Sequence, residues 1–269
     1  MEKYEKIRNE RFNKIRVFVY LLLSVALCFV VVKFLMQPSH PCVYQRNLKI
    51  EDDFTILTAA NEIYFEELKN LVGSIHYWEP MRRYKFRVHK LNGIRIVIYN
   101  LGLASTHVNE INSWCNVVLR DFNFDNHPPH VQNLQNFAFL PLIINENLSR
   151  GSVLWLSSGT ELRRSISNIL QKRLASTGHW TSTSKNSLCH FTGENVFNCF
   201  NTTRVKYKCE DPSRVLMDST HIAVKKNSVF HLNILPEVVN LVLREECLVP
   251  PSFEQSIFSM SMVDFFNLS

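Results

Sequence analysis

The sequence lacks the patterns that mark several common functional classes. No two of its seven cysteines have the C-x-x-C spacing of a zinc site or a redox motif. It has no basic stripe with interleaved aromatic residues, and we therefore expect no nucleic-acid partner. No internal repeat or low-complexity segment is present. The 269 residues are enough for one domain with a substantial core.

Charge is missing from residues 17–32, and the apolar segment continues to Met36. The 20 residues from 17 to 36 have about the length of a helix that spans the ~30 Å hydrocarbon core of a bilayer. A cleaved signal peptide is the alternative, but its apolar region is shorter and a small-x-small cleavage site follows it. No such site follows Met36, so we expect an uncleaved anchor with a single membrane span.

The charges that flank this segment predict its orientation. Residues 1–16 carry six Lys and Arg side chains, whereas residues 37–50 carry two. Because Lys and Arg favour the cytoplasmic side, we expect a type II protein of the Golgi or endoplasmic reticulum membrane. Its parts would be a cytoplasmic tail (1–16), an anchor (17–36), a luminal stem (37–52) and a luminal domain (53–269).

Two further features are typical of a secretory compartment. Sequons at Asn147, Asn201 and Asn267 are candidate sites of N-glycosylation. The cysteines outside the span are even in number, and disulfides form in an oxidising lumen. Their pairing stays open, because six cysteines allow many combinations. These cysteines are Cys42, Cys115, Cys189, Cys199, Cys209 and Cys247.

The first half of the chain alternates strand-like and helix-like segments. Phe54–Ala60 is an apolar run typical of a buried strand, and Asn61 is a plausible N-cap for the helix that follows. Further strands are expected over 95–99, 116–120 and 153–156, and further helices after Ser105 and over 131–148. Pro141 should kink the last helix or start a new one. The alternation predicts an α/β fold with a mostly parallel sheet and helices on both of its faces.

The second half is less regular. Ser, Thr and Asn are abundant over residues 180–207, which we expect to form an extended loop region. Val215–Met217 and His221–Val224 are short strand candidates. Residues 229–246 are typical of a helix with a possible interruption at Pro236.

The strand over residues 153–156 is the centre of this pattern. It ends in Ser157, Ser158 and Gly159, small residues that let a ligand approach the backbone, and a helix is expected directly afterwards. Ligands of open α/β sheets bind beyond the carboxyl ends of the strands. Enzymes that use nucleotide sugars often have an aspartate at such a junction, where it holds the divalent cation that bridges the diphosphate. This chain has Ser157 there.

Several ordered motifs resemble those of a known family. They are Thr58-Ala-Ala, Ile98-Tyr-Asn-Leu-Gly-Leu, Asn133-Leu-Gln-Asn-Phe-Ala-Phe-Leu-Pro-Leu-Ile-Ile, Val153-Leu-Trp-Leu-Ser-Ser, Glu246-Cys-Leu-Val-Pro-Pro and Glu254-Gln-Ser. Together they resemble a large invertebrate family of type II membrane proteins of unknown function with a GT-A glycosyltransferase-like domain. The resemblance implies a single GT-A-like, Rossmann-like domain, a nucleotide sugar as donor substrate and a glycan or glycoprotein as acceptor.

The resemblance also implies site residues. The donor site would be lined by Thr58, Ala60, Asn100, Ser157 and Ser158. The catalytic residues would be Glu254 and Gln255. Glu254 could act as a general base on an acceptor hydroxyl, and the alternative is a surface or capping carboxylate.

Four positions depart from the family pattern. Asn100 and Ser157 stand where the family has aspartate, and Leu140 stands where it has lysine. Glu254 replaces a further aspartate and lengthens the carboxylate by one methylene. Because Mg²⁺ and Mn²⁺ favour carboxylate oxygens over a neutral hydroxyl, the resemblance makes a divalent metal doubtful in this chain, and we expect no metal ligands.

The remaining candidates for chemistry are weaker. His127 and His130 flank two prolines with no third ligand in evidence, which favours a simple loop over a metal site. Asp218 lies near an expected strand end, and His221 adjoins an apolar run typical of a core or rim histidine. Ser157 has no histidine partner at a recognisable spacing, which disfavours a hydrolase nucleophile.

Two functions remain open. The first is a glycosyltransferase of the secretory pathway with a degenerate, metal-free donor site. The second is a catalytically inactive relative that acts as a luminal binding or scaffolding protein. The three lost charges favour the second, whereas Gln255 and the complete strand order favour the first.

Overall fold

The computed structural model describes residues 54–79, 95–209, 211, 214–248 and 253–268. These residues belong to the second of two units, Met1–Asn47 and Leu48–Ser269. The expected tail, anchor and stem lie outside the described residues. Within the described part, no helix is long and apolar enough to cross a membrane.

A six-stranded sheet organises the domain, with the strand order β3-β2-β1-β4-β8-β5. The strands β1 (Phe54–Ala60), β2 (Arg95–Asn100), β3 (Val117–Asp121) and β4 (Ser152–Leu156) are parallel to one another. β8 (His221–Val224) is antiparallel to both of its neighbours, β4 and β5 (His179–Trp180). The mostly parallel sheet predicted from the sequence is therefore confirmed.

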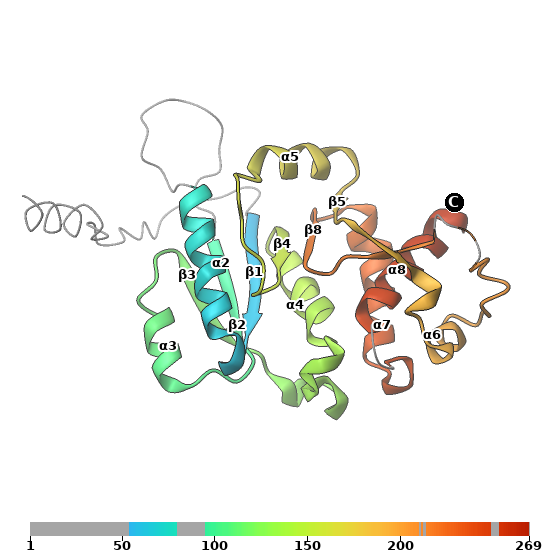
Figure 1. Ribbon diagram of the computed structural model, residues 1–269, viewed down its shortest axis with the longest axis horizontal. Helices are drawn as coiled ribbons and strands as arrows, with labels where there is room; N and C mark the ends of the chain where they lie inside the picture. The colour runs from blue at the N-terminus through green and yellow to red at the C-terminus, as the bar shows by residue number, and fades with distance from the viewer. Residues whose placement is uncertain (1–53, 80–94, 210, 212–213, 249–252, 269) are drawn as a thin grey trace, which may run out of the picture. The chain divides into compact units, whose positions relative to one another are not determined.

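Each face of the sheet is covered by helices, because the buried strands are apolar on both sides. On one face, Ile56, Ile98 and Leu154 pack with α2 (Phe65–Trp78), α3 (Ser105–Ile111) and α5 (Ser167–Ser176). On the other, Leu57 and Trp155 pack with α4 (Phe139–Leu148), α7 (Leu235–Val242) and α8 (Phe253–Leu268). Figure 1 shows α2 and α3 near strands β1 to β3, and α7 beside α8.

The first helix forms as the sequence predicts. Asn61 accepts a hydrogen bond from the Tyr64 backbone N–H at 3.3 Å and caps the short turn Glu62–Tyr64, which leads into α2. The expected apolar stripe of α2 is buried along its whole length. It consists of Phe65, Leu68, Val72 and Ile75.

The helix expected over 131–148 is shorter than predicted. Two 3₁₀ turns, Pro129–Gln132 and Leu134–Asn136, come before α4. Asn136 Oδ1 accepts from the Ala138 N–H at 3.0 Å, and this side-chain bond replaces helix pairing. Pro141 is the third residue of α4, where its missing N–H costs no helical hydrogen bond, so the predicted break lies at the start of the helix.

The second half contains a two-stranded sheet of β6 (Thr183–Ser187) and β7 (Val215–Met217), with α6 (Glu194–Cys199) between them in the chain. A π-helical turn, Phe230–Ile234, leads into α7, whose second residue is Pro236, so the predicted interruption is present. The segment over residues 180–207 is more regular than an extended loop. α8 was not predicted from the sequence.

Two disulfides join the irregular segments. Cys189 pairs with Cys209, and Cys199 pairs with Cys247. Cys115 is disulfide-bonded as well, and Cys42 lies outside the described residues. Oxidised cysteines are therefore confirmed among the residues that the structure describes.

A buried carboxylate fixes the loop that follows β4. This loop continues to Ser167, so α5 does not begin directly after Gly159 as predicted. Glu79, at the end of α2, is 8% exposed, and its Oε1 accepts from Ser165 Oγ at 2.9 Å and the Ile166 N–H at 2.6 Å. Ser167 donates to both carboxylate oxygens. A carboxylate at the N-terminus of α5 also interacts favourably with the helix dipole.

We expect Glu79→Gln to lower the free energy of unfolding by about 1.5–3 kcal/mol, because a charged acceptor of several buried hydrogen bonds is lost. Thermal and urea unfolding followed by circular dichroism would measure the change. The matched control is Glu67→Gln, which changes an exposed glutamate on the same helix and should shift the stability by less than about 0.5 kcal/mol. Equal effects of the two substitutions would contradict the role given to Glu79.

Candidate functional site

Polar side chains gather where the parallel strands end. β1, β2, β3 and β4 all end at the same side of the sheet, and β8 begins there because Leu156 pairs with His221 in the antiparallel register. We call this region the carboxyl edge. It comprises Asn61, Asn100, Asp121, Ser157–Gly159, Ser219–His221 and Gln255.

Ser157 is attached to the carboxyl edge through its backbone. Its N–H donates to the Thr220 carbonyl oxygen at 2.8 Å, and its own carbonyl oxygen accepts from the Thr160 N–H at 2.9 Å. The Ser157 hydroxyl has no hydrogen-bond partner among the described residues. Ser158 is only 8% exposed. Of the two serines, Ser157 is therefore the one with an accessible hydroxyl to offer a ligand.

Gln255 reaches the same turn from the last helix. Its Nε2 donates to Ser219 Oγ at 2.8 Å, and Ser219 precedes the residue that holds Ser157. The two predicted site residues, although 98 positions apart in the sequence, thus meet at one turn. The side chain of Glu254 lies outside the described residues.

Asp218 and His221 flank this turn. Asp218 accepts from the Thr220 N–H at 2.9 Å and from Ser182 Oγ at 3.3 Å. Burial alone would raise the pKa of Asp218, but the hydrogen bonds from Thr220 and the nearby His221 and Ser182 lower it below its ordinary value. The pKa of His221 is lowered by burial, only partly offset by Asp218, and its ring lies 4.8 Å from that of Trp180. The turn therefore presents an ionised carboxylate beside a neutral imidazole.

Asn100 has a local role that an aspartate could not fill unchanged. Its Oδ1 accepts from the Gly102 N–H at 2.9 Å and the Leu103 N–H at 2.7 Å. Its Nδ2 donates to Asp121 Oδ1 at 2.9 Å, across the register pair of β2 and β3. The amide thus organises the loop after β2 and compensates the carboxylate of Asp121.

Thr58 and Ala60 do not offer their side chains to a ligand. Thr58 is 0% exposed and Ala60 is 2% exposed, and Ala60 packs with the α2 face of the sheet. The assignment of Thr58 and Ala60 to a donor site therefore stays a prediction, and in the packing observed a ligand could contact them only through their backbone. Burial between two neighbouring strands, which the sequence motif did not reveal, is the physical reason.

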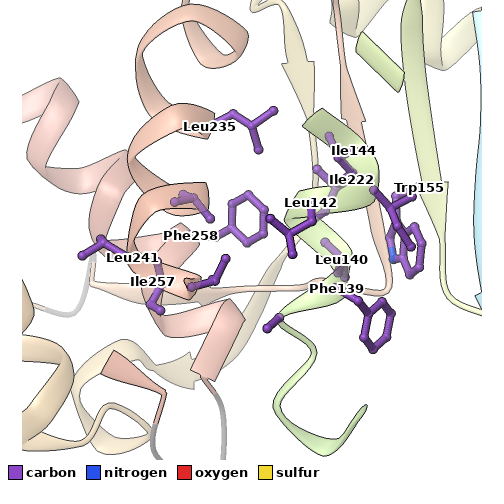
Figure 2. Packing of buried hydrophobic residues seen from close by; sticks show 14 of the residues in the cluster. Phe139, Leu140, Leu142, Ile144, Trp155, Ile222, Leu235, Leu241, Ile257 and Phe258 are labelled. Atoms are coloured by element: carbon purple, nitrogen blue, oxygen red, sulfur yellow. The ribbon is translucent and has the colours of Figure 1, made fainter. Parts of the chain in front are cut away.

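Leu140 belongs to the core and not to the carboxyl edge. It is 2% exposed and lies in the apolar cluster that includes Trp155 of β4 and Phe258 of α8. Figure 2 shows Leu140 within this cluster. A lysine ammonium placed in the same surroundings would lose its hydration without an ion-pair partner from the cluster, which is costly. The apolar packing around residue 140 therefore fits the leucine of this chain better than the lysine of the family pattern.

An exposed aromatic side chain at the carboxyl edge was missed by the sequence analysis. Tyr64 is 51% exposed and lies three residues after Asn61, and its neighbour Ile63 is 78% exposed. Tyr64 precedes the apolar stripe of α2 and lies four residues after Ala60, the last residue of the buried strand β1. The sequence signal for Tyr64 was an aromatic residue that follows a buried strand but does not belong to the apolar stripe of the next helix.

Among the side chains that the structure describes, the carboxyl edge shows no cluster of metal ligands. Ser157 and Ser158 supply neutral hydroxyls, and Asp218 already accepts two hydrogen bonds. Within the described ranges, no three His, Cys, Asp or Glu side chains come together in a way that could hold a metal ion. His127 stacks on Phe122 with ring centroids 5.2 Å apart, and His130 Nε2 lies 2.9 Å from the Val242 oxygen, so each has its own partner.

We expect Asn100→Asp to destabilise the domain at pH 7 by about 0.5–1.5 kcal/mol, because a solvent-exposed hydrogen bond is replaced by two facing carboxylates. The loss should shrink near pH ~4, where one carboxyl is protonated. The double variant Asn100→Asp/Asp121→Asn exchanges the donor and acceptor and should recover most of the stability. Thermal unfolding at both pH values would measure this, and a double variant no more stable than Asn100→Asp would contradict the pairing.

Comparison with known proteins supports the fold. Residues 28–145, less than half of the chain, match the profile of a protein family of unknown function, DUF1647. A search of curated proteins found no significant match. Several solved structures with a similar fold are glycosyltransferases.

One of them is the apo structure of WbbM, a bifunctional glycosyltransferase, with a TM-score of 0.51 and 12% identity over 81% of this chain and 38% of WbbM. An active-site variant of LgtC also gives a TM-score of 0.51, with 14% identity over 77% of this chain and 69% of LgtC. The galactosyltransferase LgtC with donor and acceptor sugar analogues gives 0.49, with 14% identity over 77% and 70%. At such identities the likeness concerns the fold alone. The chain has a GT-A-like fold, as the sequence predicts.

Proposed function

We propose that this chain is a glycosyltransferase-like membrane protein of the secretory pathway. In this proposal, residues 17–36 anchor it with type II topology and the remainder lies in the lumen of the Golgi or endoplasmic reticulum. The carboxyl edge binds a nucleotide sugar through neutral side chains instead of a bridging metal. The acceptor is a glycan or a glycoprotein.

One observation carries the proposal: Ser157 after β4 and Gln255 on α8 meet at the turn Ser219–Thr220. The first residue follows the strand end at which α/β sheets bind ligands, and the second comes from the last helix. An accessible hydroxyl and a side-chain amide at one turn are groups that hydrogen-bond sugar hydroxyls. Glu254, next in sequence to Gln255, is the proposed general base toward an acceptor hydroxyl.

Tyr64 supplies an apolar surface at the same edge. Tyr64 is 51% exposed and lies four residues after the end of β1, the strand adjacent to β4. Aromatic side chains stack on nucleobases, whichever base is present, and also pack against the apolar faces of sugars. We therefore assign Tyr64 to contact with the donor.

Charge limits how strongly such a donor binds. Among the described residues that we assign to the carboxyl edge there is one carboxylate, Asp121, and no Lys or Arg, and the carboxylate of Asp218 lies directly before its turn. A diphosphate next to these carboxylates is poorly stabilised, because electrostatic stabilisation of the leaving group is usually a large catalytic contribution. Weak donor affinity is the expected consequence, and the proposal does not require rapid turnover.

A catalytically inactive binding protein is the second candidate, and the position of Leu140 favours it. Its side chain fills the apolar core next to Trp155, where the family pattern has a lysine. The core is thus complete without a charge that could approach a diphosphate. In this second function the same carboxyl edge would bind a glycan or glycoprotein without transferring a sugar.

We expect the unmodified protein to show little Mn²⁺-dependent affinity for a nucleoside diphosphate, and Ser157→Asp to create it. The new carboxylate would stand at the end of β4, while the burial of Val153 to Leu156 keeps the strand in place. Titration calorimetry with UDP and GDP, with and without Mn²⁺, would measure this. For Ser157→Asp, we expect the nucleotide to bind at least about tenfold more tightly with Mn²⁺ than without it, a difference of about 1.4 kcal/mol in binding free energy.

Ser157→Asn is the matched control for this substitution. It has the size of the aspartate without its charge, so it should leave the nucleotide affinity independent of Mn²⁺. Tight Mn²⁺-dependent binding by the unmodified chain would show that other residues hold the metal, and the proposed metal-free site would then be rejected.

We expect Tyr64→Ala, introduced into the Ser157→Asp background, to weaken nucleotide binding by roughly 5- to 150-fold, because stacking on a base contributes about 1–3 kcal/mol. Tyr77→Ala is the control, since Tyr77 is also exposed, at 74%, but lies at the opposite end of α2. Equal affinities of the two variants would remove Tyr64 from the donor site.

A further inference from the structure

The sequons are a motif that the proposed function does not use, and the structure distinguishes between them. Asn147 lies in α4 and is 3% exposed. Its Nδ2 donates to Tyr99 Oη and to the Ile143 carbonyl oxygen, both at 2.8 Å, and its Oδ1 accepts from Arg120 at 3.2 Å. A glycan attaches through Nδ2, so this packing excludes one. Asn147 is therefore not a glycan site of the folded domain, contrary to what its sequon suggests.

Asn201 has the opposite surroundings. It is exposed and follows α6, and its backbone adopts a left-handed conformation with φ of +50°. The turn has backbone hydrogen bonds from the Asn201 N–H to the Asn198 oxygen and from the Thr202 N–H to the Phe197 oxygen, both at 3.0 Å. The Asn201 side-chain amide makes no hydrogen bond within the described part of the chain. Its nitrogen is thus free to carry a substituent without loss of packing.

We propose that Asn201 carries an N-linked glycan, an inference that rests on the luminal placement given under the proposed function. The co-reactant is an oligosaccharide on a lipid diphosphate, presented by a membrane-bound transferase. Asn201 Nδ2 forms a bond to C1 of the first sugar, and the bond between C1 and the phosphate oxygen breaks. The lipid diphosphate leaves with the electron pair, and the amide proton passes to a base of the transferase. Thr203 supplies the hydroxyl of the sequon's third position.

The segment around Asn201 is braced by two disulfides and exposes an apolar side chain. Cys199, two residues before it, is tied to Cys247, and Cys209, eight residues after it, is tied to Cys189. The carbohydrate is therefore held on a covalently braced segment. Val205 is 88% exposed in the same segment, and a glycan four residues away shields this apolar side chain from contact with other proteins.

The test uses the full chain expressed through the secretory pathway, with electrophoretic mobility measured before and after a peptide N-glycosidase. Thr203→Ala should remove one glycan, and Thr203→Ser should retain it, because both hydroxyl residues satisfy the sequon. Ser149→Ala destroys the Asn147 sequon without changing the buried amide of Asn147. Ser269→Ala destroys the sequon at Asn267. We expect both to leave the mobility unchanged. A glycan lost in Ser149→Ala would overturn the exclusion of Asn147.

An added sequon separates failure of the site from failure of the topology. Asn227 is exposed with φ of +61°, like Asn201, and Val229→Thr completes a sequon there by replacing an exposed, β-branched residue with one of similar shape. We expect this variant to gain one glycan. If it gains a glycan while Thr203→Ala changes nothing, the assignment of Asn201 is wrong and the luminal placement stands. If neither the unmodified chain nor Val229→Thr is glycosylated, the luminal placement itself is rejected.

Discussion

The pairing of β8 with β4 is the contact that joins the two halves of this domain. The first half supplies four parallel strands, whose order follows from right-handed crossovers through covering helices. The second half is irregular and enters the sheet mainly through the antiparallel register of Val153 with Val224 and of Leu156 with His221. Because β8 starts where β4 ends, the turn before β8 lies beside Ser157. The position of the turn Ser219–Thr220 beside Ser157 depends on this one register.

The three positions that lack a charge relative to the family pattern each fit their surroundings. The Asn100 amide forms hydrogen bonds in three directions, one of them to Asp121. Leu140 is enclosed by apolar side chains, and the Ser157 hydroxyl is left without a protein partner. If a charged side chain had been lost at one of these positions alone, its former partner could be left as an unpaired charge. Among the described residues, we find no such charge beside Asn100, Leu140 or Ser157.

The sequence predicts the first half of the fold well, because two local signals agree there. The apolar run of β1 and the 3.6-residue stripe of α2 each specify one structure, and Asn61 marks the boundary between them. The start of α4 was misplaced because Asn133 and Asn136 hydrogen-bond to nearby backbone, a competition that hydrophobic periodicity does not reveal. The last helix, α8, also escaped prediction.

The candidate site was predictable only in part. Ser157 could be identified because the end of a buried parallel strand is a known binding position. Its proximity to Gln255 could not, because it depends on long-range contacts through the turn Ser219–Thr220. Thr58 and Ala60 were assigned to the donor site from a motif, yet both side chains point into the core. The residues of a motif can thus be required for the packing of a strand as well as for contact with a ligand.

The disulfide between Cys199 and Cys247 has a consequence for how the site opens. It closes a ring that contains β7, β8 and α7, whereas α8 follows the ring and is held to it by apolar packing and by hydrogen bonds, such as those of Gln255 with Ser219 and of Ser259 with the Met217 N–H. The buried side chains of Ile257, Phe258 and Met260 provide that packing, each contributing roughly 1.5–3 kcal/mol. Local unfolding can therefore release α8, and Gln255 with it, while the covalent ring keeps β8 in the sheet. One part of the candidate site, Ser157 and the turn before β8, therefore belongs to the sheet and the covalent ring, whereas Gln255 belongs to a helix that lies outside the ring.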